Sequence, residues 1–130
     1  MTDNRKIKVL IIDDELSIRG SMAGYLEDCG FDVSVSESTE KALRMIVEKK
    51  FDAAVVDLRL RGLSGDVFIM ESSRICPGIK YIIHTGSVNY ILTKELEDVG
   101  VKKEHVFLKP LDDLTVIVDT VKEMVGQEKE

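Results

Sequence analysis

The sequence predicts an α/β fold in which helices cover both faces of a parallel sheet. Strand-like and helix-like patterns alternate along the chain, which is typical of successive βαβ units. Two of the strand-like stretches are near-continuous aliphatic runs, as expected for strands that are buried on both faces. Five such units fit into 130 residues, which is enough chain for one domain with a substantial core.

Five segments have the composition of strands. The first and third, 6–12 and 52–57, contain the aliphatic runs Val-Leu-Ile-Ile and Ala-Ala-Val-Val. The other three cover 31–36, 79–84 and 105–109, and each is short and rich in aliphatic or aromatic residues. We therefore expect five strands, separated by segments long enough for helices.

Apolar side chains at three- and four-residue intervals predict two helices in the first half of the chain. The first lies between 18 and 29, and Gly30 is expected to end it because glycine readily takes the left-handed conformation of a helix C-cap. The second stripe lies between 42 and 47. Ser38 or Thr39 is positioned to cap it with a side-chain oxygen.

Three more helices are expected in the second half. A short one begins after residue 65 and must end before Pro77, since proline cannot continue a helix. Another is indicated between 92 and 99, and a glycine follows it. The clearest apolar stripe runs from 114 to 125, and Asp112 can cap its start.

The predicted topology brings three carboxylates together. Right-handed crossovers leave few arrangements for five parallel strands, and in the flavodoxin-like order 2-1-3-4-5 the chain reverses direction between the first and third strands. The first strand runs directly into Asp13 and Asp14, and the third runs into Asp57. Ligands bind at the carboxyl ends of strands beside such a reversal. The mutual repulsion of the three carboxylates at this edge calls for a cation.

Composition narrows the function classes. The 18 basic and 24 acidic residues give a net charge of −6, which disfavours a general affinity for nucleic acid or anionic membrane. Cys29 and Cys76 have no metal or redox spacing and are expected to be reduced and to act as small hydrophobic residues. No apolar run has membrane-spanning length, and the first one ends at Asp13, too early for a signal peptide. We expect a cytoplasmic location.

The marks at the strand ends resemble those of a response-regulator receiver domain of two-component signalling. Any one of them is weak, but all four occur in order at successive strand ends, so together they are specific. They are Asp13-Asp14 after the first strand, Asp57 after the third, Thr85 after the fourth and Lys109-Pro110 after the fifth. The likeness covers nearly the whole chain, and we expect a single receiver domain over 1–130, with its core at 6–125 and a frayed tail.

This resemblance implies a metal-dependent phosphoacceptor. Asp57 would take a phosphoryl group from a histidine kinase or a histidine phosphotransfer protein and form an aspartyl phosphate. Asp14 would bind Mg²⁺ directly and Asp13 through water, with Mn²⁺ as a possible substitute. Asp57 and the backbone carbonyl of Arg59 would complete the protein ligands. Mg²⁺ prefers such oxygen ligands. Glu15, the next acidic residue, is expected to face solvent in the first helical turn.

Lys109 and Thr85 would assist the phosphoryl group. The resemblance implies that Lys109 holds its charge against Asp57 and then against the phosphoryl oxygens, and that Thr85 donates its hydroxyl to one of them. It also implies a cis bond between Lys109 and Pro110. Taken singly, an aspartate that caps a turn and a lysine exposed at a strand end are ordinary structural features.

One position departs from the family pattern. The aromatic residue usual three positions before the lysine is Val106 here. Phe107 is adjacent, but one step along a strand points to the opposite face, so we expect it to be a core residue. Either Val106 gives a reduced switch or another residue couples phosphorylation to output. His84 and His105, at strand edges, are expected to be packed or surface side chains.

The preferred interpretation is a receiver that is not an enzyme, beyond self-catalysed phosphoryl acceptance and autodephosphorylation. It would switch binding to an unknown output protein or relay the phosphoryl group, as a monomer or a phosphorylation-dependent dimer, either as a whole protein or as part of a longer one. One alternative is a degenerate receiver that only binds partners. Another is a small aspartyl-phosphate phosphohydrolase, although 13–17 lacks the Asp-x-Asp-x-Thr spacing of that class. A flavin phosphate site is disfavoured because Asp13, Asp14 and Glu15 would repel it.

Overall fold

A computed structural model gives the structure of the chain and describes residues 6–58, 64–88 and 90–128, with only the backbone for 127 and 128. Five parallel strands form one sheet in the order β2-β1-β3-β4-β5, which confirms the predicted topology. The strands are β1 (Lys8–Ile12), β2 (Asp32–Ser36), β3 (Ala53–Val56), β4 (Lys80–Thr85) and β5 (Val106–Leu108).

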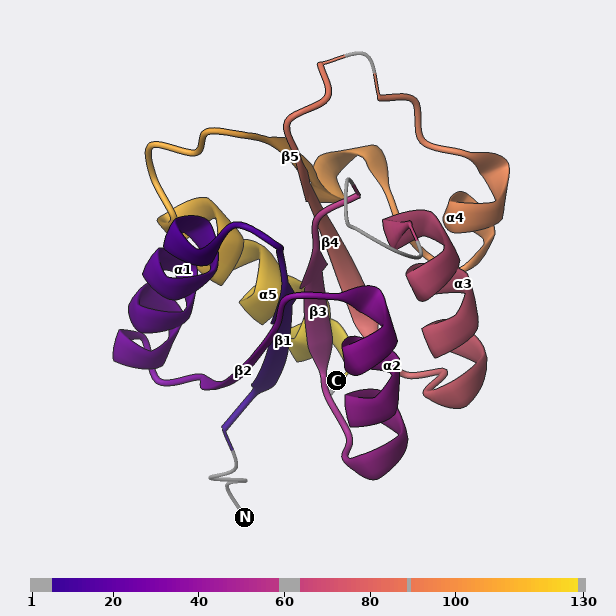
Figure 1. Cartoon of the computed structure of the whole chain (residues 1–130), viewed down its shortest axis with the longest axis horizontal. Coiled ribbons are helices and arrows are strands. Elements are labelled where there is room, and N and C mark those ends of the chain that lie inside the picture. Colours follow the sequence, from indigo (N-terminus) through magenta and orange to yellow (C-terminus); the bar gives the residue numbers. More distant parts are fainter. Residues whose placement is uncertain (1–5, 59–63, 89, 129–130) are drawn as a thin grey trace.

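Helices cover the sheet in two layers, with α1 and α5 on one face and α2, α3 and α4 on the other (Figure 1). They are α1 (Leu16–Asp28), α2 (Thr39–Glu48), α3 (Gly65–Ile75), α4 (Lys94–Asp98) and α5 (Thr115–Glu128), with a short 3₁₀ turn, η1 (Lys103–His105), before β5. The start of β1 and the end of α5 lie together at the amino ends of the strands (Figure 1). The predicted arrangement, a parallel sheet covered by helices on both faces, is therefore confirmed.

Helix boundaries follow local sequence signals. The side chain of Ser38 accepts a hydrogen bond from the backbone N–H of Lys41 and caps α2, as predicted. Gly30 and Gly100 have φ values of +96° and +103° after α1 and α4, a left-handed conformation that favours glycine. The helix expected between 92 and 99 is shorter, because Thr93 caps it and only Lys94–Asp98 is helical.

The cap of the last helix differs from the prediction. Asp113, and not Asp112, holds the first turn of α5, since its carboxylate accepts hydrogen bonds from the N–H and the hydroxyl of Thr115 at 2.9 and 2.6 Å. Two adjacent aspartates satisfy the same sequence pattern, and the path of the chain after β5 decides which of them reaches the helix.

The alternation of side chains along the strands divides the core in two. We call the cluster beneath α2, α3 and α4 the α2–α4 core, and the cluster beneath α1 and α5 the α1–α5 core. In β4, Tyr81 and Ile83 belong to the first and Ile82 to the second. The Tyr81 hydroxyl lies 2.6 Å from the Ser72 hydroxyl of α3, so its burial is compensated by a hydrogen bond.

The two cysteines are free thiols. Cys76 packs against the α2–α4 core, as predicted, but Cys29 is exposed at the end of α1, so it does not act as a core residue. Within the described ranges, none of the helices combines the length and the apolar character needed to cross a membrane.

Candidate functional site

The carboxyl ends of β1 and β3 fix three aspartates at one edge of the sheet. The backbone N–H of Asp13 donates to the carbonyl of Ser36 at 3.1 Å, and that of Asp57 donates to the carbonyl of Ile12 at 3.0 Å. These bonds continue the strand ladders one residue beyond the strands. Asp13 and Asp57 are thus held by sheet geometry rather than by a free loop, and Asp14 follows Asp13 directly.

One carboxylate oxygen from each of Asp13, Asp14 and Asp57 lies within 4.8 Å of the others. Asp13 and Asp57 are 2% and 4% exposed, and Asp14 is the most open of the three. Burial raises the pKa of Asp13, and the hydrogen bond from Glu15 N–H and the nearby ammonium group only partly oppose this. The sequence prediction that the three carboxylates meet is confirmed.

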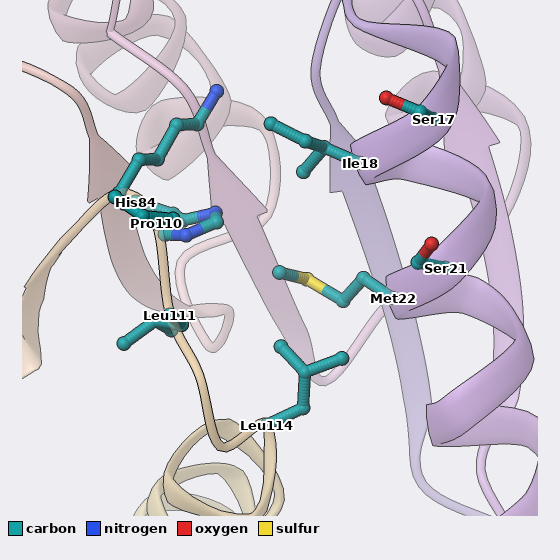
Figure 2. A pocket seen from close by; sticks show the side chains of 9 residues that line it. Ser17, Ile18, Ser21, Met22, His84, Pro110, Leu111 and Leu114 are labelled. Carbon is teal, nitrogen blue, oxygen red and sulfur yellow. The ribbon is translucent and has the colours of Figure 1, made fainter.

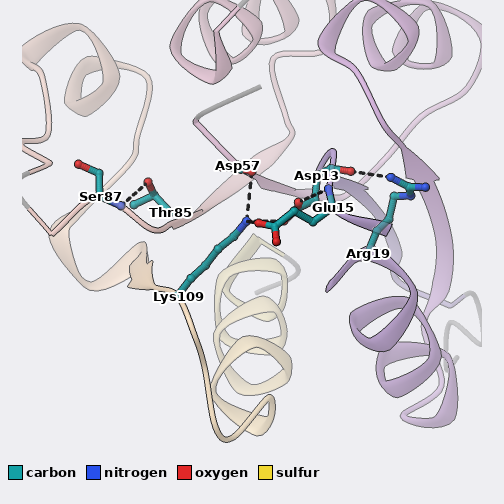
Figure 3. Close-up of polar contacts among 7 residues, drawn as sticks. All are labelled: Asp13, Glu15, Arg19, Asp57, Thr85, Ser87 and Lys109. Atoms are coloured by element: carbon teal, nitrogen blue, oxygen red, sulfur yellow. Dashed lines mark hydrogen bonds and ion pairs between the residues drawn. The ribbon is translucent and has the colours of Figure 1, made fainter. Parts of the chain in front are cut away.

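Lys109 balances part of this negative charge. Its Nζ lies 2.9 Å from Asp13 Oδ2, 3.1 Å from Asp57 Oδ2 and 3.2 Å from Glu15 Oε1 (Figure 3). Burial disfavours the ammonium, but the hydrogen bonds to Asp13 and Asp57 outweigh that effect and raise the pKa of Lys109. The backbone N–H of Lys109 bonds the carbonyl of Thr85 at 2.8 Å, and the Lys109–Pro110 peptide is cis, as expected.

The beginning of α1 contributes two residues that sequence reasoning did not place in the site. Glu15 is the N-cap residue and faces solvent as expected, yet its carboxylate also reaches Lys109. Arg19 donates from Nη1 to the backbone carbonyl of Asp13 at 2.8 Å, which secures the turn after β1. The signal for Arg19 is its position one helical turn after Glu15, on the side that faces the strand ends.

Thr85 is fully buried at the carboxyl end of β4. Its Oγ1 accepts a hydrogen bond from the backbone N–H of Ser87 at 3.1 Å (Figure 3). An accepting hydroxyl keeps its own proton for donation, so this contact leaves Thr85 able to donate to an oxyanion. Arg59, which the sequence proposed as a metal ligand through its carbonyl, lies outside the described residues.

Val106 and Phe107 face opposite sides of the sheet, as predicted. Val106 packs against the α2–α4 core, and Phe107 packs against the α1–α5 core. The position usually aromatic therefore holds a smaller side chain beside α4. Tyr90, in the loop before α4, packs against the same cluster.

The arrangement combines hard oxygen donors with a fixed ammonium group. Carboxylate oxygens at this spacing suit Mg²⁺ or Ca²⁺, which take oxygen ligands, and the described residues place no cysteine or histidine among them. A cation there would balance the carboxylates, and Lys109 would remain beside Asp57. Such a site can hold an anionic group against a carboxylate that would otherwise repel it.

Comparisons with known proteins agree with this geometry. A family model described as the response regulator receiver domain matches residues 9–122. The uncharacterized transcriptional regulatory protein YesN of Bacillus subtilis is 28% identical over 125 residues, which cover 94% of this chain and 33% of that protein. The chain thus spans about a third of the length of that curated relative.

Two solved structures share the fold. A CheY-like response regulator receiver domain protein from Methanospirillum hungatei matches with a TM-score of 0.84 at 23% identity, over 96% of this chain and 98% of the other. A response regulator protein from Burkholderia pseudomallei, solved with a phosphorylated aspartic acid, calcium ion and citrate, matches with a TM-score of 0.79 at 22% identity, over 95% and 71%.

Proposed function

The chain belongs to the receiver domain family of response regulators, which act in two-component signalling, and on that premise we propose that it accepts a phosphoryl group on Asp57. The observation that carries the proposal is the buried Asp57 carboxylate, which lies beside two other aspartates and 3.1 Å from the Lys109 ammonium. A carboxylate nucleophile needs this neutralisation before an anionic phosphoryl group can approach it.

The phosphoryl group would come from a phosphohistidine of a histidine kinase or a phosphotransfer protein. An oxygen of Asp57 attacks the phosphorus in line, and the O–P bond forms as the N–P bond of the donor breaks. The electron pair of the broken bond stays on the imidazole nitrogen, and the ring leaves in its neutral form because its other nitrogen carries a proton. The product is an aspartyl phosphate, and the Burkholderia structure was solved with a phosphorylated aspartic acid.

Asp13, Asp14 and Asp57 would hold Mg²⁺, with the Arg59 carbonyl as a further ligand and Mn²⁺ as a substitute. When bound, the cation supplies positive charge against the phosphoryl oxygens. The donor set supports this assignment, because three carboxylate oxygens converge within 4.8 Å.

Lys109 and Thr85 would act on the phosphorylated form. Lys109 already lies between Asp13 and Asp57, and after phosphorylation its ammonium group can pair with a phosphoryl oxygen. Thr85 can donate its hydroxyl proton to that oxygen while it still accepts from Ser87, and a movement of Thr85 towards the phosphoryl group would shift the loop after β4. Water would later hydrolyse the acyl phosphate, so the protein resets itself without turning over a substrate.

The output would be a change in partner binding near α4 and β5, with the receiver in the cytoplasm as a monomer or a phosphorylation-dependent dimer. We propose 1–130 as one receiver unit. Val106 favours a second candidate function, a receiver that binds partners without a phosphorylation switch, because no aromatic side chain stands at that position of β5. Among the residues that the structure describes, no contact in the site favours a phosphohydrolase.

Intact mass spectrometry after incubation with acetyl phosphate tests the proposal. Wild-type protein is expected to gain one phosphoryl group only when Mg²⁺ is present, and Asp57→Asn is expected to gain none. Asp32→Asn is the matched control, because Asp32 begins β2 at the opposite end of the sheet and should not affect labelling.

The result distinguishes the three functions. An adduct on Asp57→Asn contradicts the assignment of Asp57 as the phosphoacceptor. No adduct on wild type despite Mg²⁺ contradicts it too, and supports the interaction-only receiver. Release of phosphate from a phosphomonoester well beyond one equivalent per protein would support the phosphohydrolase.

A further inference from the structure

His84 is a buried histidine that the proposed function does not use. It lies in β4 immediately before Thr85 and is only 4% exposed. Within the described part of the chain, neither Nδ1 nor Nε2 of His84 has a hydrogen-bond partner. Most buried polar side chains are paired, so this ring calls for an explanation.

The His84 ring borders a cavity of about 210 Å³ between α1 and the segment that follows β5. Figure 2 shows the ring on one wall of this cavity, facing Ile18 and Met22 of α1. Pro110, Leu111 and Leu114 add apolar side chains, and the hydroxyls of Ser17 and Ser21 lie along the α1 side. Since an apolar cavity of about 150 Å³ is known to bind benzene, a ring-sized molecule fits here.

Packing alone does not require histidine at this position. The preceding residue with the same orientation, Ile82, is aliphatic and belongs to the α1–α5 core. An aliphatic residue at position 84 would fill the same space without two polar nitrogens. The unpaired ring is therefore the feature of this cavity that a ligand would explain.

The residues that line the cavity favour an uncharged ligand, because they offer no unpaired charge. Burial, and secondly the nearby Lys109, lower the pKa of His84 to about 4, so the ring is neutral at pH 7 and presents one donor and one acceptor. Lys109 is the one charged residue among those that line the cavity, and its ammonium is paired with Asp13 and Asp57. An anion would find no unpaired counter-charge, and a cation would meet a like charge.

We propose that this cavity binds a small, uncharged, planar molecule of one or two fused rings that carries an N–H donor and a ring acceptor. The apolar walls hold the ring faces, and His84 provides the polar contacts that orient the molecule. The proposal does not rest on phosphorylation, since none of these contacts requires a phosphoryl group, although Lys109 borders both the cavity and Asp57.

Ligand titrations followed by ¹H–¹⁵N NMR on the full chain test the proposal with three probes. Indazole offers a donor and an acceptor, indole offers the donor alone, and indene offers neither. Indazole is expected to bind more tightly than about 1 mM, given the usual affinity per atom of small ligands. Its affinity should exceed that of indene by about tenfold, because the contacts to His84 are lost in indene.

The affected amides and two variants locate the site. Shifts should appear at Ile18, Met22 and Leu111. His84→Leu should weaken the binding of indazole by about tenfold and leave the affinity for indene unchanged. Ser21→Leu, at an exposed position on the cavity rim, should weaken the binding of all three probes. This variant keeps the proposal testable if His84→Leu does not fold. Glu27→Leu, exposed on the same helix and away from the cavity, is the matched control.

Several results would overturn the proposal. They are an absence of shifts for all probes, equal affinities for indazole and indene, shifts that map outside the cavity, and indazole binding that His84→Leu leaves unchanged. Each would mean that His84 is satisfied by water or by packing alone.

Discussion

Acid should destabilise this protein through His84, and His84→Leu should remove that effect. The folded state lowers the pKa of His84 from its usual 6.5 to about 4 because burial disfavours the charged ring. The unfolded chain therefore binds more protons between these two values. The stabilising contribution is fully present above pH 6.5 and is lost as the pH falls towards 4.

The magnitude follows from the size of the shift. Each pKa unit corresponds to about 1.4 kcal/mol, and the two pKa values imply a loss of about 2 kcal/mol between pH 7 and pH 5. The cavity beside the ring is open to solvent on one side, which screens the effect. We therefore expect wild type to lose between about 1 and 2 kcal/mol more than His84→Leu over this interval.

Urea unfolding at pH 7, 6 and 5, followed by circular dichroism in the presence of EDTA, measures the difference. His105 also has a lowered pKa through burial, but it contributes to both curves and cancels in their difference. The matched control His105→Leu should retain the His84 effect. Parallel curves for wild type and His84→Leu would refute the argument, because they would show that the His84 ring is as easily protonated in the folded state as in the unfolded chain.

Three further predictions concern the site and the core. Adding Mg²⁺ at about 100 times its dissociation constant should stabilise wild type by about 2.7 kcal/mol in thermal unfolding, EDTA should reverse this, and no shift would argue against the metal site. Gly65→Ala should destabilise by about 1–3 kcal/mol in urea unfolding, because its Cβ would lie 2.8 Å from the Asp57 carbonyl oxygen, whereas Gly24→Ala meets no atom within 4 Å and should not destabilise. Tyr81→Phe should cost about 1–2 kcal/mol by removing the buried bond to Ser72, and a double-mutant cycle with Ser72→Ala that shows no coupling would contradict this.

Much of the fold was predictable because local signals and topology agree. The aliphatic runs that end at Asp13 and Asp57 identify the central strands, and the rules for parallel sheets then place both aspartates at one edge. The alternation of Val106 and Phe107 follows from strand geometry alone.

The missed features depend on contacts between distant segments. Glu15 and Lys109 are far apart in the sequence, and their contact depends on how closely the end of β5 approaches the start of α1. The choice between Asp112 and Asp113 depends on the path of the chain after the Lys109–Pro110 turn. The cavity at His84 arises where α1 and the segment after β5 approach each other, so no local pattern in β4 could indicate it.

The placement of the start of β1 and the end of α5 has a practical consequence for binding measurements. Because every strand runs the same way and α5 returns antiparallel to them, the start of β1 and the end of α5 both lie opposite the acidic edge (Figure 1). A biotin tag or a fluorescent protein joined beyond β1 or α5 would therefore lie at the end of the sheet opposite Asp13, Asp57 and Lys109. Immobilising the protein from both ends in turn gives two orientations that should report the same partner affinity, which offers an internal check on surface artefacts.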